Sequence, residues 1–407
     1  MANTLTVIDM VARESLRIAH EKATFVGTCD RQYDDSFSKP GAKIGSTLRV
    51  RNPNQYTRRT GSRVMNVQTI AESTQTITLA TQDGVDIELT SADLSLSFDD
   101  MSKRVIEPAI SVLVSGIDSD HIVTATKAVY NCVGTAGTVV GAVTSGFSDT
   151  SALGQARAKL NQYLAPKDSS RVLQMDSVTM ASVANGIKGL FHPSDQVQEA
   201  FREGFVAKSA MATFYENERT YTHTNGADVT CSTSSDAAVT DAGTNITITG
   251  GTVTVGSIFT VAGVYSCHPE TKKSLGHLQQ FVITAGTSGA LTVSPATILT
   301  GAKQNVCSAA DAQLATTDFN GQTCTFVGAA STSYRHNLMY HKDAFAFVTG
   351  DLPIMDDAAK CVRVQKDGLS LRVWQASDII NDRMLLRVDI LHGFKVLRPE
   401  WASRITN

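Results

Sequence analysis

The sequence predicts an α+β body that carries a smaller, inserted all-β domain. Apolar residues recur at helical spacing in Thr6–Lys22 and over a longer stretch, Asp99–Tyr130. Residues 226–330 differ abruptly in composition, because they are rich in Thr, Gly, Ser, Ala and Val but hold only three basic and six acidic side chains. We therefore expect residues 1–225 and 335–407 to form the body, with a small antiparallel β-domain or barrel between them.

Three strands are predicted ahead of the long helix, at Ser46–Arg51, Thr74–Ala80 and Val85–Thr90. The dipeptide Asp83-Gly84 is typical of two-residue hairpin turns, so we expect it to join the second strand to the third. The polar stretch from Pro53 to Met65 is predicted to be an exposed loop between the first two strands.

The segment Asp99–Tyr130 carries a long apolar stripe. Pro108 suits the first turn of a helix or a kink, and Gly116 lies in the middle, so one long bent helix and two shorter helices both stay open. Further helices are predicted over residues 153–164 before Pro166, over residues 177–188 after the capping residue Asp176, and over Ser194–Phe201.

Short apolar segments separated by turn residues predict the strands of the insertion and of the C-terminal part. Those of the insertion are Asn245–Ile248, Ile258–Tyr265, Leu278–Thr284, Leu291–Val293 and Cys324–Val327. Outside it, Arg171–Met175 is predicted as a short strand, and alternating apolar and polar residues predict half-buried strands over 369–374 and 386–390.

Composition excludes several classes of function. The chain is 42% hydrophobic, which argues against disorder, and its net charge of −3 does not suit a protein that neutralises nucleic-acid phosphates. It has no run of 18 apolar residues, so no membrane span is expected.

Seven cysteines are present without any CxxC pair, so neither a zinc ribbon nor a redox motif is predicted. Four of them lie between residues 231 and 324, which leaves a disulfide among these four open. Because no secretion signal is recognisable, reduced and mostly buried thiols are the expectation.

No catalytic or cofactor motif is found. The segment Gly41–Thr47 resembles a phosphate-binding loop but lacks the GK[ST] ending. Asp118, Asp120 and His121 could ligate a metal, but within a helical stripe the acids are expected to face solvent or a neighbouring chain. His336 and His341 are expected to be ordinary packed or surface residues. The sequence therefore predicts no enzyme, no metal and no cofactor.

The charges before the long helix are segregated by sign. Residues 36–71 hold seven basic side chains and no acid, whereas residues 72–100 hold seven acids and no basic side chain. A hairpin arm with one basic and one acidic flank suits docking onto copies of itself, although salt bridges within the hairpin explain the same pattern. The predicted intersubunit contacts are Lys43, Arg49, Arg58, Arg59, Arg63, Asp83, Asp86 and Glu88.

The ordered set of segments resembles the major coat proteins of tailed bacteriophages, in particular the short-tailed, P-twenty-two-type family with the Hong-Kong-97-type fold. The segments that carry the resemblance are the arm Lys39–Leu94, Asp93–Phe98 before the long helix, Phe191–Gln196, Tyr221–Gly226, Val255–Tyr265 and Gln279–Thr284 in the insertion, Asn337–Phe345, and Arg387–Pro399. The likeness extends over nearly the whole chain.

The resemblance implies a capsid fold with an N-terminal arm, an extended β-hairpin arm, a long spine helix, an α/β axial domain and an inserted β-domain. The implied boundaries are 1–36 for the N-terminal arm, 37–98 for the hairpin arm, 99–148 for the spine helix and peripheral domain, 149–225 and 334–391 for the two parts of the axial domain, 226–333 for the inserted barrel, and 392–407 for a C-terminal peripheral strand.

The resemblance also implies a structural function. Hexamers and pentamers of the chain would build an icosahedral shell, assembled in the cytoplasm of the bacterial host with the help of a scaffolding protein and expanded as the genome is packaged. Scaffolding and portal proteins are the implied partners, with only non-specific contact to packaged DNA, no contact with a membrane, and the virion as the final location.

Two other interpretations compete with this one. A β-rich tail or adhesin-type binding protein would use the Thr- and Gly-rich domain to recognise a surface, and would form monomers or trimers. An enzyme would need Asp118, Asp120 and His121 in a concave site with a perturbed carboxylate.

Overall fold

The computed structural model describes most of the chain, and the architecture below refers to that part. The described residues are 4–31, 47–61, 63–65, 67–68, 72–90, 105–140, 143–144, 147–148, 151–187, 208–209, 212–355, 360–366, 369–378 and 383–407. The chain divides into two compact units, each built from separate stretches of sequence.

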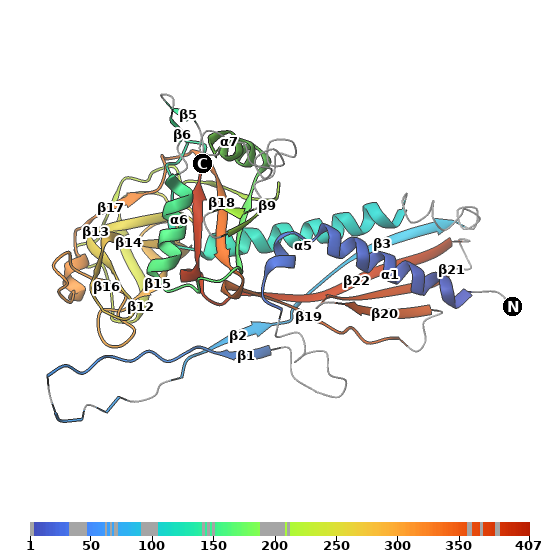
Figure 1. Cartoon of the computed structure of the whole chain (residues 1–407), viewed down its shortest axis with the longest axis horizontal. Helices are drawn as coiled ribbons and strands as arrows, with labels where there is room; N and C mark the ends of the chain where they lie inside the picture. Colours follow the sequence, from blue (N-terminus) through green and yellow to red (C-terminus); the bar gives the residue numbers. More distant parts are fainter. Residues whose placement is uncertain are drawn as a thin grey trace. The chain divides into compact units, whose positions relative to one another are not determined.

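The first unit consists of Met1–Arg51, Thr74–His121 and Phe345–Leu397. Its central element is β22 (Arg383–Val396), which pairs with β3 (Thr81–Thr90) along one edge. The other edge of β22 pairs with β21 (Leu369–Asp378) and then with β19 (Phe345–Gly350), and β20 (Lys360–Lys366) follows β21. The result is a five-stranded sheet whose strands come from both ends of the chain (Figure 1).

Helices of the first unit pack on this sheet. The helix α1 (Thr4–Lys22) begins two residues before the predicted start, and it contacts β20 and β21. Ala19 of α1, Val114 of α5 (Glu107–Ala128), and Phe347, Leu371 and Ile390 of the sheet line one small apolar pocket. The long helix is therefore part of this unit's core.

The helix α5 settles the alternative that the sequence left open. Glu107–Ala128 is one uninterrupted helix that passes through Gly116. Pro108 occupies its first turn, where a missing N–H costs nothing. The predicted residues before position 105 lie outside the described part.

The predicted turn at Asp83-Gly84 is wrong. Both residues lie inside β3, where Asp83 pairs with Ile390 and Gly84 with Asp389. Instead, β2 (Thr74–Thr78) pairs with β1 (Thr47–Arg51). A β-carbon on Gly84 would lie 2.5 Å from Oδ1 of Asp389, so the glycine makes room for a buried carboxylate rather than for a turn.

The second unit consists of Asn52–Ser73, Ile122–Ala344 and Arg398–Asn407. Its seven-stranded sheet is centred on β18 (Ser333–His341) and β7 (Arg171–Met175). The remaining strands are β4 (Cys132–Val133), β23 (Ala402–Thr406), β9 (Ala212–Glu216), β8 (Lys208–Ser209) and β10 (Tyr221–Thr224). Two helices, α6 (Ser151–Gln162) and α7 (Ser177–Ile187), contribute to its apolar core.

The insertion is a closed barrel within the second unit (Figure 1). Its six strands are β11 (Cys231–Thr233), β12 (Gly243–Thr249), β13 (Ile258–Cys267), β14 (Ser274–Ala285), β15 (Ala290–Thr297) and β17 (Thr323–Phe326). The pairing of β13 with β14 closes the ring, and the short β16 (Val306–Cys307) adds to β13. All five predicted strands are present, whereas β11 and β16 are too short to give a periodic signal.

The C-terminal strands do not group as the sequence suggested. The predicted segment 334–391 is divided, because β18 lies in the second unit while β19, β20, β21 and β22 lie in the first. Hydrogen bonding to β3, about 300 residues earlier in the chain, places β22 there. The predicted helix Ser194–Phe201 and the segments Phe191–Gln196 and Asp93–Phe98 lie outside the described residues.

Candidate functional site

We call the loop between β1 and β2, residues 52–73, the arm loop, and hydrogen bonds across it join its described residues into a ribbon. The backbone N–H of Asn52 donates to the carbonyl of Ser73 at 2.9 Å. The amide side chain of Gln68 accepts from the N–H of Thr57 at 2.8 Å and donates to its carbonyl at 2.6 Å. The pairs Asn52–Ser73 and Thr57–Gln68 continue the series of opposite residues that runs from Thr47–Thr78 to Arg51–Thr74 in β1 and β2. These two contacts therefore keep the register of the two strands.

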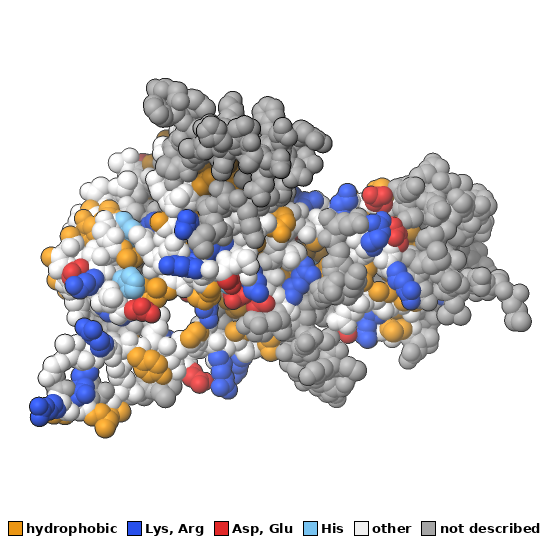
Figure 2. All heavy atoms as spheres, in the orientation of Figure 1, with side chains coloured by type: hydrophobic (Ala, Val, Ile, Leu, Met, Phe, Trp, Pro, Cys, Tyr) orange, Lys and Arg blue, Asp and Glu red, His pale blue; other side chains and the backbone are white. Residues whose placement is uncertain are grey.

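The tip of the arm loop combines basic and apolar side chains. Val64, Met65 and Val67 are 76%, 79% and 80% exposed, which are the highest values among the large apolar residues that the structure describes. Arg58, Arg59 and Arg63 are exposed on the same ribbon, and Arg59 Nη1 donates to the carbonyl of Val64 at 2.5 Å. Figure 2 shows blue and orange side chains adjoining one another on this loop, at the lower left of the view. Large apolar side chains that are exposed in neighbouring positions make this loop a candidate surface for contact with another molecule.

The predicted basic residues are distributed along this arm, and one of them lies outside the described residues. Arg49 is exposed on β1, and Arg58, Arg59 and Arg63 are in the arm loop. Lys43 is in the part that the structure does not describe. Sequence reasoning missed Val64, Met65 and Val67, although their run beside three arginines in a polar stretch is a readable signal.

The predicted acidic residues lie on β3, which pairs with β22, and the side chains of Asp83 and Asp86 lie near side chains of β22. Asp83 Oδ2 is 2.9 Å from Nε2 of His392. Asp86 lies 3.7 Å from Nε of Arg387, and both side chains are substantially exposed. Glu88 is exposed on the same strand, opposite Leu385. The basic strand β1 pairs with β2 and the acidic strand β3 pairs with β22, so Arg49 and the acids of β3 do not face one another across one hairpin.

A chain of polar contacts continues inward from Asp83. Nδ1 of His392 is 3.1 Å from Nε2 of His121, and the His121 ring stacks on Phe394 with ring centres 4.8 Å apart. Burial, and secondarily the neighbouring His392, lower the pKa of His121 to about 3. His121 is thus a neutral, packed residue at ordinary pH, which does not suit a general base.

Asp118 is a buried structural residue, contrary to the expectation that the acids of this helix face outward. Its Oδ1 accepts hydrogen bonds from the backbone N–H groups of Phe25 and Val26, at 2.8 and 2.9 Å. These groups begin the short helix α2 (Phe25–Thr28), whose own N-cap residue, Thr24, makes no side-chain capping bond. Asp118 therefore supplies the missing cap from α5, because unpaired N–H groups at a helix start need an acceptor.

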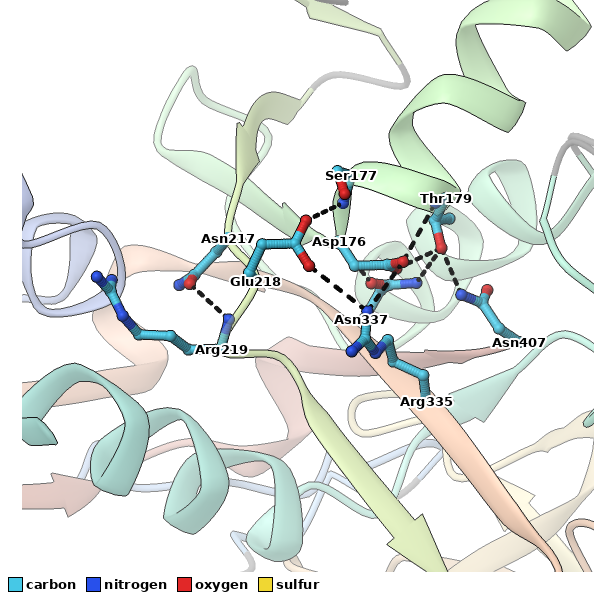
Figure 3. A network of polar contacts seen from close by, with 9 residues as sticks. All are labelled: Asp176, Ser177, Thr179, Asn217, Glu218, Arg219, Arg335, Asn337 and Asn407. Atoms are coloured by element: carbon cyan, nitrogen blue, oxygen red, sulfur yellow. Dashed lines mark hydrogen bonds and ion pairs between the residues drawn. The ribbon is translucent and has the colours of Figure 1, made fainter. Parts of the chain in front are cut away.

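A second polar network joins strands of the second unit to the start of α7 (Figure 3). Asp176 caps α7, as predicted, by accepting from Thr179 N at 3.3 Å and from the Thr179 hydroxyl. Arg335 Nη1 lies 3.2 Å from Asp176 and 3.7 Å from Glu218, and Asn337 accepts from Asp176 N at 3.1 Å. Asn407 donates to the Thr179 hydroxyl, which ties the residue after β23 into the network. These contacts hold β18, β23 and α7 together and present no open reacting group.

The described residues hold no group of three or more His, Cys, Asp or Glu side chains with metal-binding geometry. His336 and His341 are both buried and hydrogen-bonded, to Thr406 and Asp168 respectively, so they are packed residues as expected. None of the described helices has the length and hydropathy needed to cross a membrane. The exposed arm loop, rather than a cleft, is the candidate functional surface.

Comparison with known proteins identifies the group to which the chain is similar. A model of the family described as "P22 coat protein - gene protein 5" matches residues 55–404. A solved structure from Mycobacterium phage Che8 matches with a TM-score of 0.50 and 10% identity, covering 94% of this chain and 90% of that one. The capsid structure of cyanophage P-SCSP1u matches with a TM-score of 0.45 and 13% identity, covering 89% and 83%. No curated protein sequence matches the chain.

Proposed function

The chain belongs to the P22 coat protein family, and from this premise we propose that its copies assemble around a scaffolding protein into a procapsid that expands when the genome is packaged. Membership makes the chain a major capsid protein, a structural component of the virion that forms the phage shell and catalyses no reaction. Family membership also excludes the interpretation as a tail or adhesin-type protein and the interpretation as an enzyme. The observation that carries this conclusion is the family match over residues 55–404.

We assign the arm loop to contact with a neighbouring copy. Three large apolar side chains at its tip are more than three-quarters exposed, and burying each on a neighbour stabilises the contact by up to about 1.5–3 kcal/mol. Arg58, Arg59 and Arg63 beside them suit an acidic rim on that neighbour. On this proposal the exposed Asp86 and Glu88 of β3 contribute to such a rim, with Arg49 and Lys43 completing the basic side, whereas Asp83 serves its own subunit through His392.

Contact with the packaged genome is proposed to be weak and non-specific. The chain has 36 basic against 39 acidic side chains, and phosphate binding needs a concentrated positive field. The arginines of the arm loop are few and adjoin apolar residues, which suits a protein partner better than a duplex. A portal protein at one vertex is the remaining partner that family membership supports.

The arm assignment is tested by reversing charge at the loop. Arg58→Glu combined with Arg59→Glu should leave the melting temperature of the free subunit unchanged, since both side chains are exposed. The yield of shells with scaffolding protein should fall, because each lost exposed ion pair costs about 0.2–1 kcal/mol and every subunit repeats the loss.

The matched control is Arg157→Glu with Lys167→Glu, which reverses two exposed charges of the same unit outside the arm loop. A complementary variant, Met65→Ser with Val67→Ser, removes apolar surface while keeping the charges. A normal yield of shells from both arm variants would contradict docking of the arm on a neighbour. So would a lower melting temperature of the free subunit.

A further inference from the structure

The four cysteines of the inserted barrel lie in two pairs of neighbouring thiols. Cys231 of β11 and Cys324 of β17 are one pair, and Cys267 of β13 and Cys307 of β16 are the other. Within each pair, each thiol shifts the pKa of the other, as thiols do only at close range. The two pairs differ, however, in strand register, and that difference decides which of them can be bridged.

Cys231 and Cys324 are directly opposite in antiparallel strands. Opposite residues of such strands have α-carbons about 4.5 or 5.5 Å apart, and both distances fall inside the range of about 4.4–6.8 Å that a disulfide spans. Their side chains emerge on the same face of the sheet, toward the barrel core. A bridge between them therefore needs rotation of the side chains and no movement of the backbone.

Cys267 and Cys307 are diagonal neighbours. Cys307 lies opposite Tyr265, and Cys267 N donates to the carbonyl of Asn305, so each cysteine is two residues away from the partner of the other. Diagonal positions are about 7–8 Å apart, beyond the usual span of a disulfide. Cys267 and Cys307 therefore lack the backbone spacing that accepts a bridge.

The chemistry of the first pair is also asymmetric. The hydrogen bond with Cys324 lowers the pKa of the Cys231 thiol, against the opposing effects of burial and of Asp228. The same bond, and burial, raise the pKa of Cys324. Cys231 is thus the thiol that forms the nucleophilic thiolate, and it remains 8% exposed. In the second pair, burial first and then Cys307 raise the pKa of Cys267 to about 12, and Cys307 is fully buried.

We propose that Cys231 and Cys324 form an intrachain disulfide that fastens the first strand of the barrel to its last, once the shell meets an oxidising environment. The Cys231 thiolate attacks a small disulfide such as oxidised glutathione, and one glutathione thiolate leaves. Cys324, after losing its proton, then attacks the Cys231 sulfur of the mixed disulfide and releases the second glutathione. Two protein thiols are oxidised, and one external disulfide is reduced to two thiols.

The position of the bridge gives it a consequence for the domain. β11 is the strand by which the chain enters the barrel, and β17 is the strand by which it leaves. The two strands are joined by only a short ladder between Cys231–Ser232 and Thr323–Cys324. A disulfide there joins the first strand of the barrel to its last and lowers the conformational entropy of the unfolded insertion.

The test uses the full-length protein, purified with reductant and then incubated with oxidised glutathione. Remaining thiols are alkylated after denaturation, and peptides are mapped without reduction. Trypsin is combined with a protease that cleaves at Asp, because trypsin alone leaves Cys231 on one peptide with Cys267, and Cys307 on one peptide with Cys324. We expect a peptide pair that joins Cys231 to Cys324, with two of the seven thiols lost and a mass lower by about 2 Da. Oxidation should also raise the melting temperature, by roughly 5–10 °C.

Controls follow from the second pair. Cys267→Ala and Cys307→Ala should leave the cross-linked peptide unchanged, whereas Cys231→Ala and Cys324→Ala should abolish it together with the gain in melting temperature. Mapping of the unmodified chain does not depend on any variant folding. Seven alkylated thiols after oxidation, a bridge between other cysteines, or a bridge between two chains would each overturn the proposal.

Discussion

The inserted barrel and the five-stranded sheet of the first unit are held together in different ways. The barrel strands come from one continuous stretch, Cys231–Phe326, and surround an apolar cluster that contains three phenylalanines, Phe259, Phe281 and Phe319. The sheet joins β3 to strands almost 300 residues later, and buried charge lies at its centre. Asp389 is fully buried between Arg372 Nη2 at 2.6 Å and Arg387 Nε at 2.7 Å.

This difference shows where each part is vulnerable. All strands of the barrel come from Cys231–Phe326 and surround an apolar core, so a single apolar substitution there removes packing without removing a partner strand. A sheet assembled from distant segments depends on a few polar contacts that fix register, and removing one partner of a buried ion pair leaves an uncompensated charge. We therefore expect substitutions at polar residues to disrupt the first unit more than the barrel.

The largest effect is expected for Asp389→Ala. It leaves the guanidinium of the almost fully buried Arg372 without its carboxylate, at a cost of about 3–5 kcal/mol in unfolding free energy. Hydrogen exchange should accelerate in β3, β21 and β22 while the barrel stays protected. Asp86→Ala is the control, because that exposed pair with Arg387 contributes at most about 1 kcal/mol. Equal losses of unfolding free energy in Asp389→Ala and Asp86→Ala would contradict the claim that the first unit depends on its buried ion pair.

Acid should weaken the first unit through His121. The pKa of this histidine is lowered from 6.5 to about 3 in the folded chain, mainly by burial, so the unfolded chain binds the extra proton between these values. Stability is therefore complete above pH 6.5 and declines as the pH falls toward 3, by about 2 kcal/mol at pH 5.

His121→Phe should flatten this part of the pH dependence while keeping the ring stack on Phe394. Denaturant titrations between pH 7 and 5 measure this pH dependence of the unfolding free energy. His268→Gln in the barrel is the control. An unchanged slope in His121→Phe would show that another group is responsible. His223 and His336 of the second unit contribute in the same direction, since burial also lowers the pKa of both, that of His223 to about 4.

A smaller effect is expected at the helix cap. Asp118→Ala removes the acceptor of two backbone N–H groups at the start of α2, which should destabilise the first unit by about 1–2 kcal/mol. Asp120→Ala, two residues along the same helix, is the matched control. Local exchange at Phe25 and Val26 is the informative measurement, and slow exchange of both amides in Asp118→Ala would refute the capping role.

The smallest effect is expected when the barrel is separated from the rest of the chain. Residues 226–333 expressed alone should keep a cooperative melt and a dispersed amide spectrum, because the strands of the barrel pair with one another. Among the contacts that separation removes are the hydrogen bond between the Tyr163 hydroxyl and Ser266, at 2.8 Å, and the two bonds between Gln280 and Cys132. A fragment without a cooperative melt would show that contacts with the rest of the second unit are needed beside the barrel core.

The sequence by itself determined the features that depend on neighbouring residues. Periodicity located α1, α5 and the five longer barrel strands, the cap at Asp176 followed from its position before an apolar run, and the composition change marked the insertion. The resemblance to phage coat proteins also followed from the order of segments, and the family match confirmed it.

Only the tertiary structure decided what distant segments do to one another. The Asp83-Gly84 dipeptide has the local chemistry of a turn, yet pairing with β22 draws it into a strand, where the glycine accommodates the Asp389 carboxylate. Asp118 belongs to an apolar helix and caps another helix about 90 residues earlier in the chain. Cys231 and Cys324 became partners only when the barrel closed. Periodicity describes which face of an element is buried, whereas the partner that covers that face is chosen by the free energy of packing the whole chain.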